Sequence, residues 1–364
     1  MSILTSQVAS SEYQAIADDA LKDEDNGIWL ACLPATMHHD WFQRFHWIRW
    51  LDRLAEQDNI VLPGGGQFLA FQAAWQRLLE TGELDITPSL PSVLREVYQA
   101  WFAEGHPDQH QAEIIAWNDY VEAIVEYHRP HLTLQTLADY EQMLDRLAGS
   151  CFQVLPHLEP QQRTIARHFG VVDQFYNTLR DLYEDARQGV CYFPQEVLNE
   201  FGVTTAEILD FSCFENPGYG PLMQFWLQDY LPELRRRTLP FLQSEPMPMD
   251  WQALILWFIH RYRRIDGVMA SCHDNFVDFA PAYWETVQRD LRRQQTLGCH
   301  SFRQWYQRLY HPQHIADFIG VNLEDLTATM PTGYGLLHAP RTIRPIPAKS
   351  LRPRFRCHSL PLYP

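Results

Sequence analysis

The side chains best suited to chemistry lie between Gln174 and Pro194, where acidic, amide and guanidinium groups recur at helical spacing. A helix turns about 3.6 residues at a time, so residues at i, i+3, i+7 and i+11 share one side. That series is occupied by Gln174, Asn177, Asp181 and Asp185. Two carboxylates four residues apart repel each other on a helix, so their presence favours a bound cation. Mg²⁺ fits best, because this hard ion takes one or two carboxylates and completes its shell with water and phosphate oxygens.

The residues around this pair extend the argument from a cation to a diphosphate. Arg180 and Arg187 stand close by, and guanidinium matches phosphate oxygens through paired hydrogen bonds. Gly189 and Pro194 then end the predicted helix. A solvated helix face is the alternative interpretation of the same spacing. The combination of acid, amide and Arg before a helix end predicts a metal-bridged diphosphate site.

The pattern N-x-x-R-D-x-x-E-D-A-x-x-G-x-x-Y-x-P in this region resembles the second aspartate-rich motif of squalene and phytoene synthases. The matching positions are Asn177, Arg180, Asp181, Glu184, Asp185, Ala186, Gly189, Tyr192 and Pro194. The G-x-x-x-Q spacing from Gly170 to Gln174 also fits. So many matches at fixed spacing make the resemblance specific.

An earlier segment, RWLDRLAEQD, resembles the family's first acidic motif, R-x-x-D-D-x-x-D. Arg49 and Asp52 match, Arg53 replaces the middle Asp, and Glu56 replaces the last one. Asp52 and Glu56 are again four residues apart, and Glu can also ligate Mg²⁺. The alternative here is an amphipathic helix with its charges outside.

A third resemblance covers Thr136 to Leu158, which is similar to the family's Y-C-Y-x-V-A-G-x-V-G helix. Ala148 and Gly149 match, but Asp145 stands where the family commonly has Tyr. A carboxylate in a cationic cavity would act as a base or counterion, which makes Asp145 a candidate catalytic residue. Tyr262, in the late helix WFIHRYRRIDG, is the second candidate.

The resemblance implies a Mg²⁺-dependent prenyltransferase that joins two allylic prenyl diphosphates, farnesyl or geranylgeranyl, head to head into a squalene- or phytoene-type product. NADPH would be the reductant if the product were squalene. The implied metal ligands are Asp52, Glu56, Asp181 and Asp185. The implied substrate-binding residues are Arg49, Arg53, Gln174, Asn177, Arg180, Arg187 and Tyr192. Two other classes stay open: a relative that ionises one prenyl diphosphate for cyclisation or transfer to another acceptor, and a non-catalytic relative that keeps the fold.

Composition limits the partners and the compartment. The chain has 364 residues and 46% hydrophobic residues, enough for one large core or two modest ones. A net charge of −16 argues against a nucleic-acid partner. The 7 Cys form no C-x-x-C motif, and no basic region precedes an apolar run at the N-terminus, which indicates a cytoplasmic protein.

Apolar residues repeat at helical spacing along most of the chain and strand alternation is rare, which predicts an all-α protein. With the resemblance, the expected architecture is an isoprenoid synthase-type helical bundle around a central cavity. We expect residues 1–310 to form this domain and residues 311–364 to be an irregular extension rich in Pro and Arg. Residues 340–364 carry five Arg, one Lys and no acid. That tail is either simply solvated or makes peripheral contact with an anionic membrane.

Overall fold

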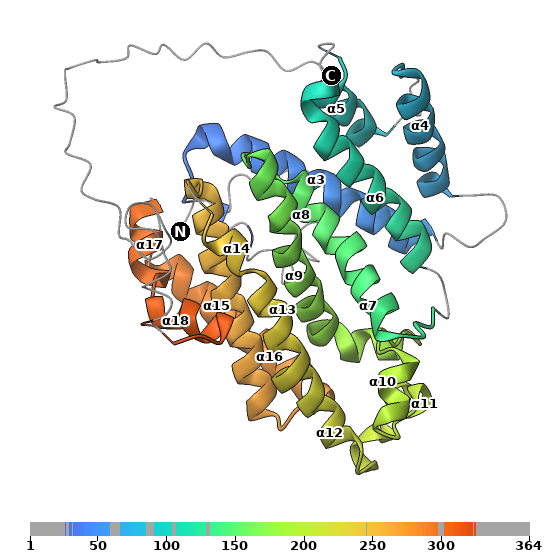
Figure 1. The fold of residues 1–364 in the computed structure, drawn as a ribbon, viewed down its shortest axis with the longest axis vertical. Helices are drawn as coiled ribbons and strands as arrows, with labels where there is room; N and C mark the ends of the chain where they lie inside the picture. The colour runs from blue at the N-terminus through green and yellow to red at the C-terminus, as the bar shows by residue number, and fades with distance from the viewer. Residues whose placement is uncertain are drawn as a thin grey trace, which may run out of the picture.

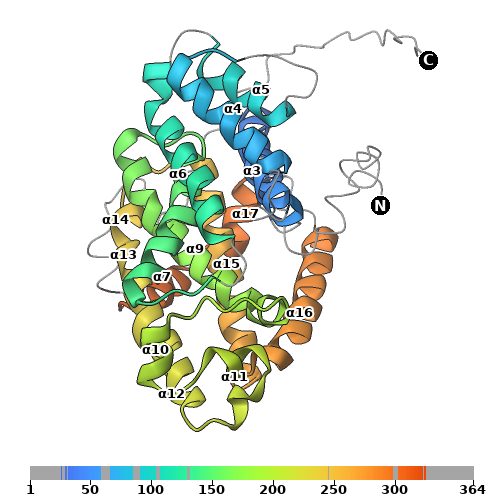
Figure 2. The ribbon, with the colours of Figure 1, turned by 90° about the vertical axis from the view of Figure 1, so that its right-hand side faces the viewer.

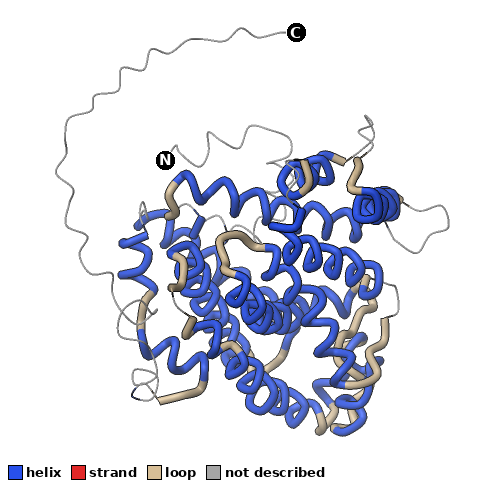
Figure 3. The backbone as a smooth tube through the Cα atoms, turned by 45° about the horizontal axis from the view of Figure 1, so that its top comes forward, coloured by secondary structure: helices blue, strands red, loops and turns tan. Residues whose placement is uncertain are grey.

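The computed structural model of this chain is helical throughout the part that it describes. The described residues are 26, 29, 30, 32–58, 66–84, 91–103, 107–128, 132–244, 246–297, 302–322 and 324. Among them no residue lies in a strand, and Figure 3 shows helices joined by turns and loops. The predicted all-α class is therefore confirmed. Within the same ranges, no helix is long and apolar enough to cross a membrane.

The helices pack around α9 (Pro160–Arg187), which runs through the middle of the molecule (Figure 1). Before it come α3 (Ala35–Asp58), α4 (Gln67–Thr81), α5 (Ser92–Trp101), α6 (Gln111–Tyr127), α7 (Leu137–Leu144) and α8 (Ser150–Val154). After it come α10 (Gln195–Glu200), α11 (Thr205–Leu209), α12 (Tyr219–Gln224), α13 (Leu231–Arg237), α14 (Leu239–Leu242), α15 (Met249–Ser271), α16 (Phe276–Leu297), α17 (Phe302–Leu309) and α18 (Pro312–Ile319). Figure 2 shows α3, α4 and α5 at one end of the molecule and α10, α11 and α12 at the other.

Local sequence signals set both ends of α9. The side chain of Glu159 caps the first turn, that of Gln162 reaches back to the Glu159 N–H, and Pro160 occupies the first turn, where a missing N–H costs nothing. At the other end Gly189 adopts a left-handed conformation with φ 78°. The following N–H, of Val190, donates to the carbonyl of Asp185 at 2.9 Å, which satisfies one of the last helical carbonyls. The helix that carries the predicted diphosphate site is thus capped at both ends.

Two hydrophobic cores divide the described residues. The smaller core lies between the second half of α3 and helices α4, α5 and α6, where Trp47 and Trp101 meet edge to face at 5.4 Å. The larger core surrounds α9 and α15. It also takes in Trp41, from the first half of α3, whose indole N–H donates to the buried Asp250 at 2.6 Å. Helix α3 therefore contributes to both cores.

A π-helical turn, Asp145–Gly149, lies between α7 and α8, inside the segment Thr136 to Leu158 that resembles one family helix. This turn lies against α9 at a point where the two backbones nearly touch. A Cβ placed on Gly170 would lie only 2.3 Å from the carbonyl oxygen of Ala148 and 2.9 Å from the Cα of Gly149. Glycine is required there because no side chain fits between the two backbones.

The C-terminal boundary differs from the expectation. We expected irregular chain from residue 311, but Pro312–Ile319 forms α18 and packs into the larger core. The ring of Phe318 lies 5.9 Å from that of Tyr262 and 6.1 Å from that of Phe169. Proline at the first turn of α18 and the left-handed Gly320 after its end are the local signals for this helix. The basic segment 340–364, and its predicted membrane contact, lie outside the described residues.

Candidate functional site

The four residues of the predicted stripe lie on α9, where Gln174, Asn177, Asp181 and Asp185 are all partly exposed. The guanidinium of Arg180 donates two hydrogen bonds to the carboxylate of Asp181, from Nε to Oδ1 at 2.8 Å and from Nη2 to Oδ2 at 2.6 Å. Their side chains are only 10% and 17% exposed, so this pair is more strongly coupled than a surface ion pair. The structure therefore brings the predicted cation ligand and the predicted phosphate ligand into direct contact.

The end of α9 places the remaining residues of this segment. Arg187 is exposed, and its guanidinium carbon lies 5.7 Å from the centre of the Tyr183 ring. Tyr192 is partly exposed in the loop that follows. Cys191 lies between Arg187 and Tyr192 in the sequence. Burial and the negative charge of Asp185 raise the pKa of its thiol to about 12. Cys191 therefore stays protonated beside the acidic stripe and is no nucleophile.

The first acidic segment forms the second half of α3. Arg49 Nη1 donates to Asp52 Oδ2 at 3.1 Å, and the Nε2 atom of His128 lies 3.9 Å from Asp52 Oδ1. Arg53 follows on the same helix and is partly exposed. Glu56 lies in the last turn of α3, but its side chain falls outside the described part of the structure.

Helix α8 packs against α6 and α9. Burial and the negative charges of Asp52 on α3 and Asp173 on α9 together raise the pKa of Cys151, on α8, well above its usual value. Both carboxylates thus lie close enough to influence the same buried thiol. Among the described side chains, no group of three or more His, Cys, Asp or Glu residues is positioned to hold a metal ion.

A buried polar cluster adjoins the stripe one turn before Asn177. Asp173, 8% exposed, accepts hydrogen bonds from the guanidinium of Arg261 and from the hydroxyl of Tyr262, the latter at 2.8 Å. It also accepts one from Asn177 Nδ2 at 3.3 Å. Burial and the adjacent charge of Asp173 raise the pKa of Tyr262 well above its usual value, so this phenol keeps its proton. The ring of Tyr262 stacks on that of Tyr176 at 4.2 Å.

The sequence predicted only part of this cluster. Tyr262 was predicted as a site residue, and the structure places it beside the second acidic segment. Asp173 and Arg261 were missed, although Asp173 lies four residues before Asn177 on the same helical series. Arg264, in contrast, donates to Asp290 on α16 at 2.6 Å.

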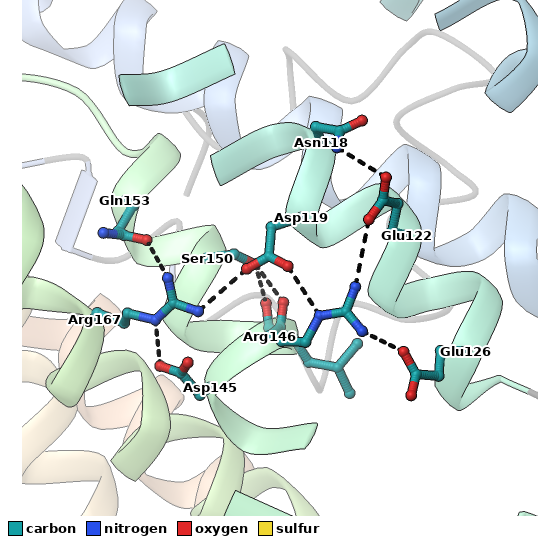
Figure 4. A network of polar contacts seen from close by, with 10 residues as sticks. Asn118, Asp119, Glu122, Glu126, Asp145, Arg146, Ser150, Gln153 and Arg167 are labelled. Atoms are coloured by element: carbon teal, nitrogen blue, oxygen red, sulfur yellow. Dashed lines mark hydrogen bonds and ion pairs between the residues drawn. The ribbon is translucent and has the colours of Figure 1, made fainter. Parts of the chain in front are cut away.

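Asp145 belongs to a different group of charges, shown in Figure 4. Its carboxylate accepts a hydrogen bond from Arg167 on α9, and Arg167 also pairs with Asp119 on α6 at 3.2 Å. Asp119 in turn pairs with Arg146 at 2.9 Å, and Arg146 binds Glu126 further along α6. The network ties α6, the π-helical turn and α9 together.

This network and the acidic stripe lie at different positions along α9. Arg167 precedes Asn177 by ten residues, which is about 15 Å of helix at about 1.5 Å per residue. With an ion pair to Arg167 and a side chain 37% exposed, Asp145 has a structural role in this network. A catalytic role for Asp145 stays a prediction.

Comparison with known proteins shows which family this chain resembles. The family model described as squalene/phytoene synthase matches residues 22–284. The chain is similar to phytoene synthase 3 of Zea mays, at 31% identity over 29% of this chain and 24% of that protein. It is also similar to the 15-cis-phytoene synthase of Synechococcus elongatus, at 31% identity over 27% of this chain and 32% of that protein. These alignments span about a quarter to a third of the relatives' lengths.

A crystal structure of a dehydrosqualene synthase shares the fold, with a TM-score of 0.50 and 16% identity over 77% of this chain and 96% of that one. This likeness confirms the predicted isoprenoid synthase-type helical fold. The family model covers both acidic segments and the Tyr262 helix. Its match extends over most of the chain, and the chain belongs to the squalene/phytoene synthase family.

Proposed function

We propose that this protein is a prenyl diphosphate-dependent transferase that condenses two allylic prenyl diphosphates head to head into a squalene- or phytoene-type product. One observation carries the proposal: α9 presents Asn177, Asp181 and Asp185 on one partly exposed stripe, with Arg180 paired to Asp181, in a member of this family. Oxygen ligands and a guanidinium on one helix suit a diphosphate bound together with a divalent cation.

The residues present fit Mg²⁺ by the chemistry of their donors. The partly exposed groups on α3 and α9 are carboxylate and amide oxygens, which hard cations prefer. Asp52, Glu56, Asp181 and Asp185 would hold the ions, as the family motifs imply. When bound, Mg²⁺ neutralises charge on the leaving diphosphate.

The Arg residues of the site have a direct part in binding substrate. Arg180 now pairs with Asp181, and a diphosphate offers its guanidinium the same paired acceptor geometry as a carboxylate. Arg49 and Arg187, at the first acidic segment and at the end of α9, would contact the outer phosphate oxygens. The rings of Tyr176 and Tyr262 are buried next to Asp173, and apolar surroundings of this kind would keep water from capturing a carbocation.

The test is incubation of the full chain with farnesyl or geranylgeranyl diphosphate and Mg²⁺, with and without NADPH, followed by assays of released diphosphate and extracted hydrocarbon. A product with twice the carbon number of the substrate supports head-to-head coupling. A monomeric terpene, or a prenylated acceptor, would move the assignment to a relative that ionises a single prenyl diphosphate. No diphosphate release would identify a non-catalytic relative.

A matched pair of double variants locates the activity. We expect Asp181→Ala with Asp185→Ala to lower diphosphate release by at least about 100-fold, because charge stabilisation at the reacting group is lost. Asp278→Ala with Glu285→Ala removes two exposed carboxylates from α16 and should leave turnover unchanged. Full turnover in the first variant would refute the proposed site.

A further inference from the structure

Asp173 is a buried carboxylate with three hydrogen-bond donors around it. It receives hydrogen bonds from Arg261 and Tyr262 on α15 and from Asn177 on its own helix. Arg261 is 4% exposed and Tyr262 is fully buried, so neither donor moves freely away. Asp173 therefore has a fixed position one turn before Asn177.

The surroundings of Asp173 also determine which way the amide of Asn177 points. An ionised carboxylate only accepts hydrogen bonds, and a guanidinium only donates them. Next to Asp173, Asn177 must therefore present its NH₂ group, since its carbonyl oxygen would meet another acceptor. In the described part of the chain no group donates to Asn177 Oδ1. The carbonyl oxygen, at the other end of the planar amide, is therefore not used by Asp173, and Asp181 lies one helical turn further along α9.

We propose that Asp173, held by Arg261 and Tyr262, is a positioning residue that turns the carbonyl oxygen of Asn177 toward the acidic stripe as a ligand for a divalent cation. The inference rests on the proposed function, because it deepens the chemistry of the same site. Partners that orient a metal ligand in this way typically raise metal affinity by about 10- to 100-fold.

The isosteric variant Asp173→Asn tests the orientation directly. The new amide must keep its oxygen toward Arg261 and Tyr262, which are donors, and so turns its NH₂ toward Asn177. Asn177 then flips to accept that hydrogen bond and presents NH₂ to the stripe. An NH₂ group cannot ligate a cation, so affinity should fall by about 10-fold or more.

A second substitution reverses the effect if the reasoning holds. In Asp173→Asn with Asn177→Asp, the same hydrogen bond runs in the opposite direction, from residue 173 to residue 177. The carboxylate at 177 has a second oxygen, which faces the stripe whichever way the group turns. Cation affinity should return to at least the wild-type value.

The experiment is calorimetric titration of Mn²⁺, an oxygen-preferring probe, into the full chain in the presence of saturating inorganic diphosphate. Asp250→Asn is the matched control, because Asp250 is also buried and accepts hydrogen bonds from Trp41 and His157 but does not contact Asn177. The inference is supported by weak binding in Asp173→Asn, restored binding in the double variant and normal binding in the control.

The other outcomes overturn it in distinguishable ways. Wild-type affinity in Asp173→Asn would refute the positioning role and leave the proposed function standing. Equal losses in Asp173→Asn and Asp250→Asn would show that the effect is general destabilisation. Absence of binding in the wild-type protein would overturn both the inference and the cation-dependent function on which it rests.

Discussion

The contact between Gly170 and the π-helical turn gives the sharpest prediction for stability. In Gly170→Ala, the new Cβ would lie 2.3 Å from the carbonyl oxygen and 2.8 Å from the carbonyl carbon of Ala148. An ordinary contact between these atoms is about 1 Å longer, and both neighbours are backbone atoms that no rotamer change can move. Helix α9 and the turn must therefore separate.

The loss in free energy of unfolding can be estimated from substitutions that overpack protein cores. Overpacked sites usually lose about 1–3 kcal/mol, and a backbone clash belongs at or above the upper end of that range. Unfolding entropy of about 2.1 cal/mol/K per residue over 364 residues gives about 0.8 kcal/mol/K. A loss of about 3 kcal/mol thus lowers the melting temperature by about 4 °C.

Gly267→Ala is the matched control, because Gly267 lies inside α15 and a Cβ placed there meets nothing within 4 Å. That substitution should stabilise the protein by about 0.5–1 kcal/mol through helix propensity. Calorimetric melting of the two variants against the wild type is the assay. A Gly170→Ala protein that melts at or above the wild-type temperature would refute the close approach of the two backbones.

Two further predictions concern buried charges. Hydrogen bonding to Asp250 raises the pKa of His157 above its usual 6.5. The protonated imidazole therefore stabilises the folded protein fully below about pH 6.5, and this contribution is lost as the pH rises through the folded-state pKa. Urea unfolding of the wild type should show stability falling from about pH 6.5 upward, and a profile that stays flat, or matches that of His157→Gln, would contradict this. Arg261→Met leaves Asp173 buried without its cation and should cost about 3–5 kcal/mol in urea unfolding. The same change at the exposed Arg263 should cost less than about 0.5 kcal/mol, and equal losses would contradict the buried pair.

Much of the site was predictable because it lies on one helix. The period of about 3.6 residues is enough to bring Asn177, Asp181 and Asp185 onto one side of α9, and the glycine after it marks the end. The structure confirms the helix and the shared exposure of these residues. What the spacing could not show is that Arg180 turns onto Asp181 rather than into solvent, since this depends on rotamers.

The contacts between helices were beyond prediction from one sequence. Asp173 and Arg261 are 88 positions apart, and only the packing of α15 on α9 brings them together. The π-helical turn was hidden in the same way, because Asp145 to Gly149 carries no local signal against an α-helix. The ion pair of Asp145 with Arg167 depends on that turn, so the family resemblance suggested only a residue inside a cavity.

The division of the molecule into two cores has a consequence for movement. Asp52 lies on the part of α3 that belongs to the smaller core, whereas Asp181 lies on α9 in the larger one. The two acidic segments thus belong to different cores, and α3, α6 and α8 join these cores because each contributes buried residues to both. A relative rotation of the two cores would strain the ion pair between Asp119 on α6 and Arg167 on α9, so packing and charge together oppose a change in the separation of the acidic segments.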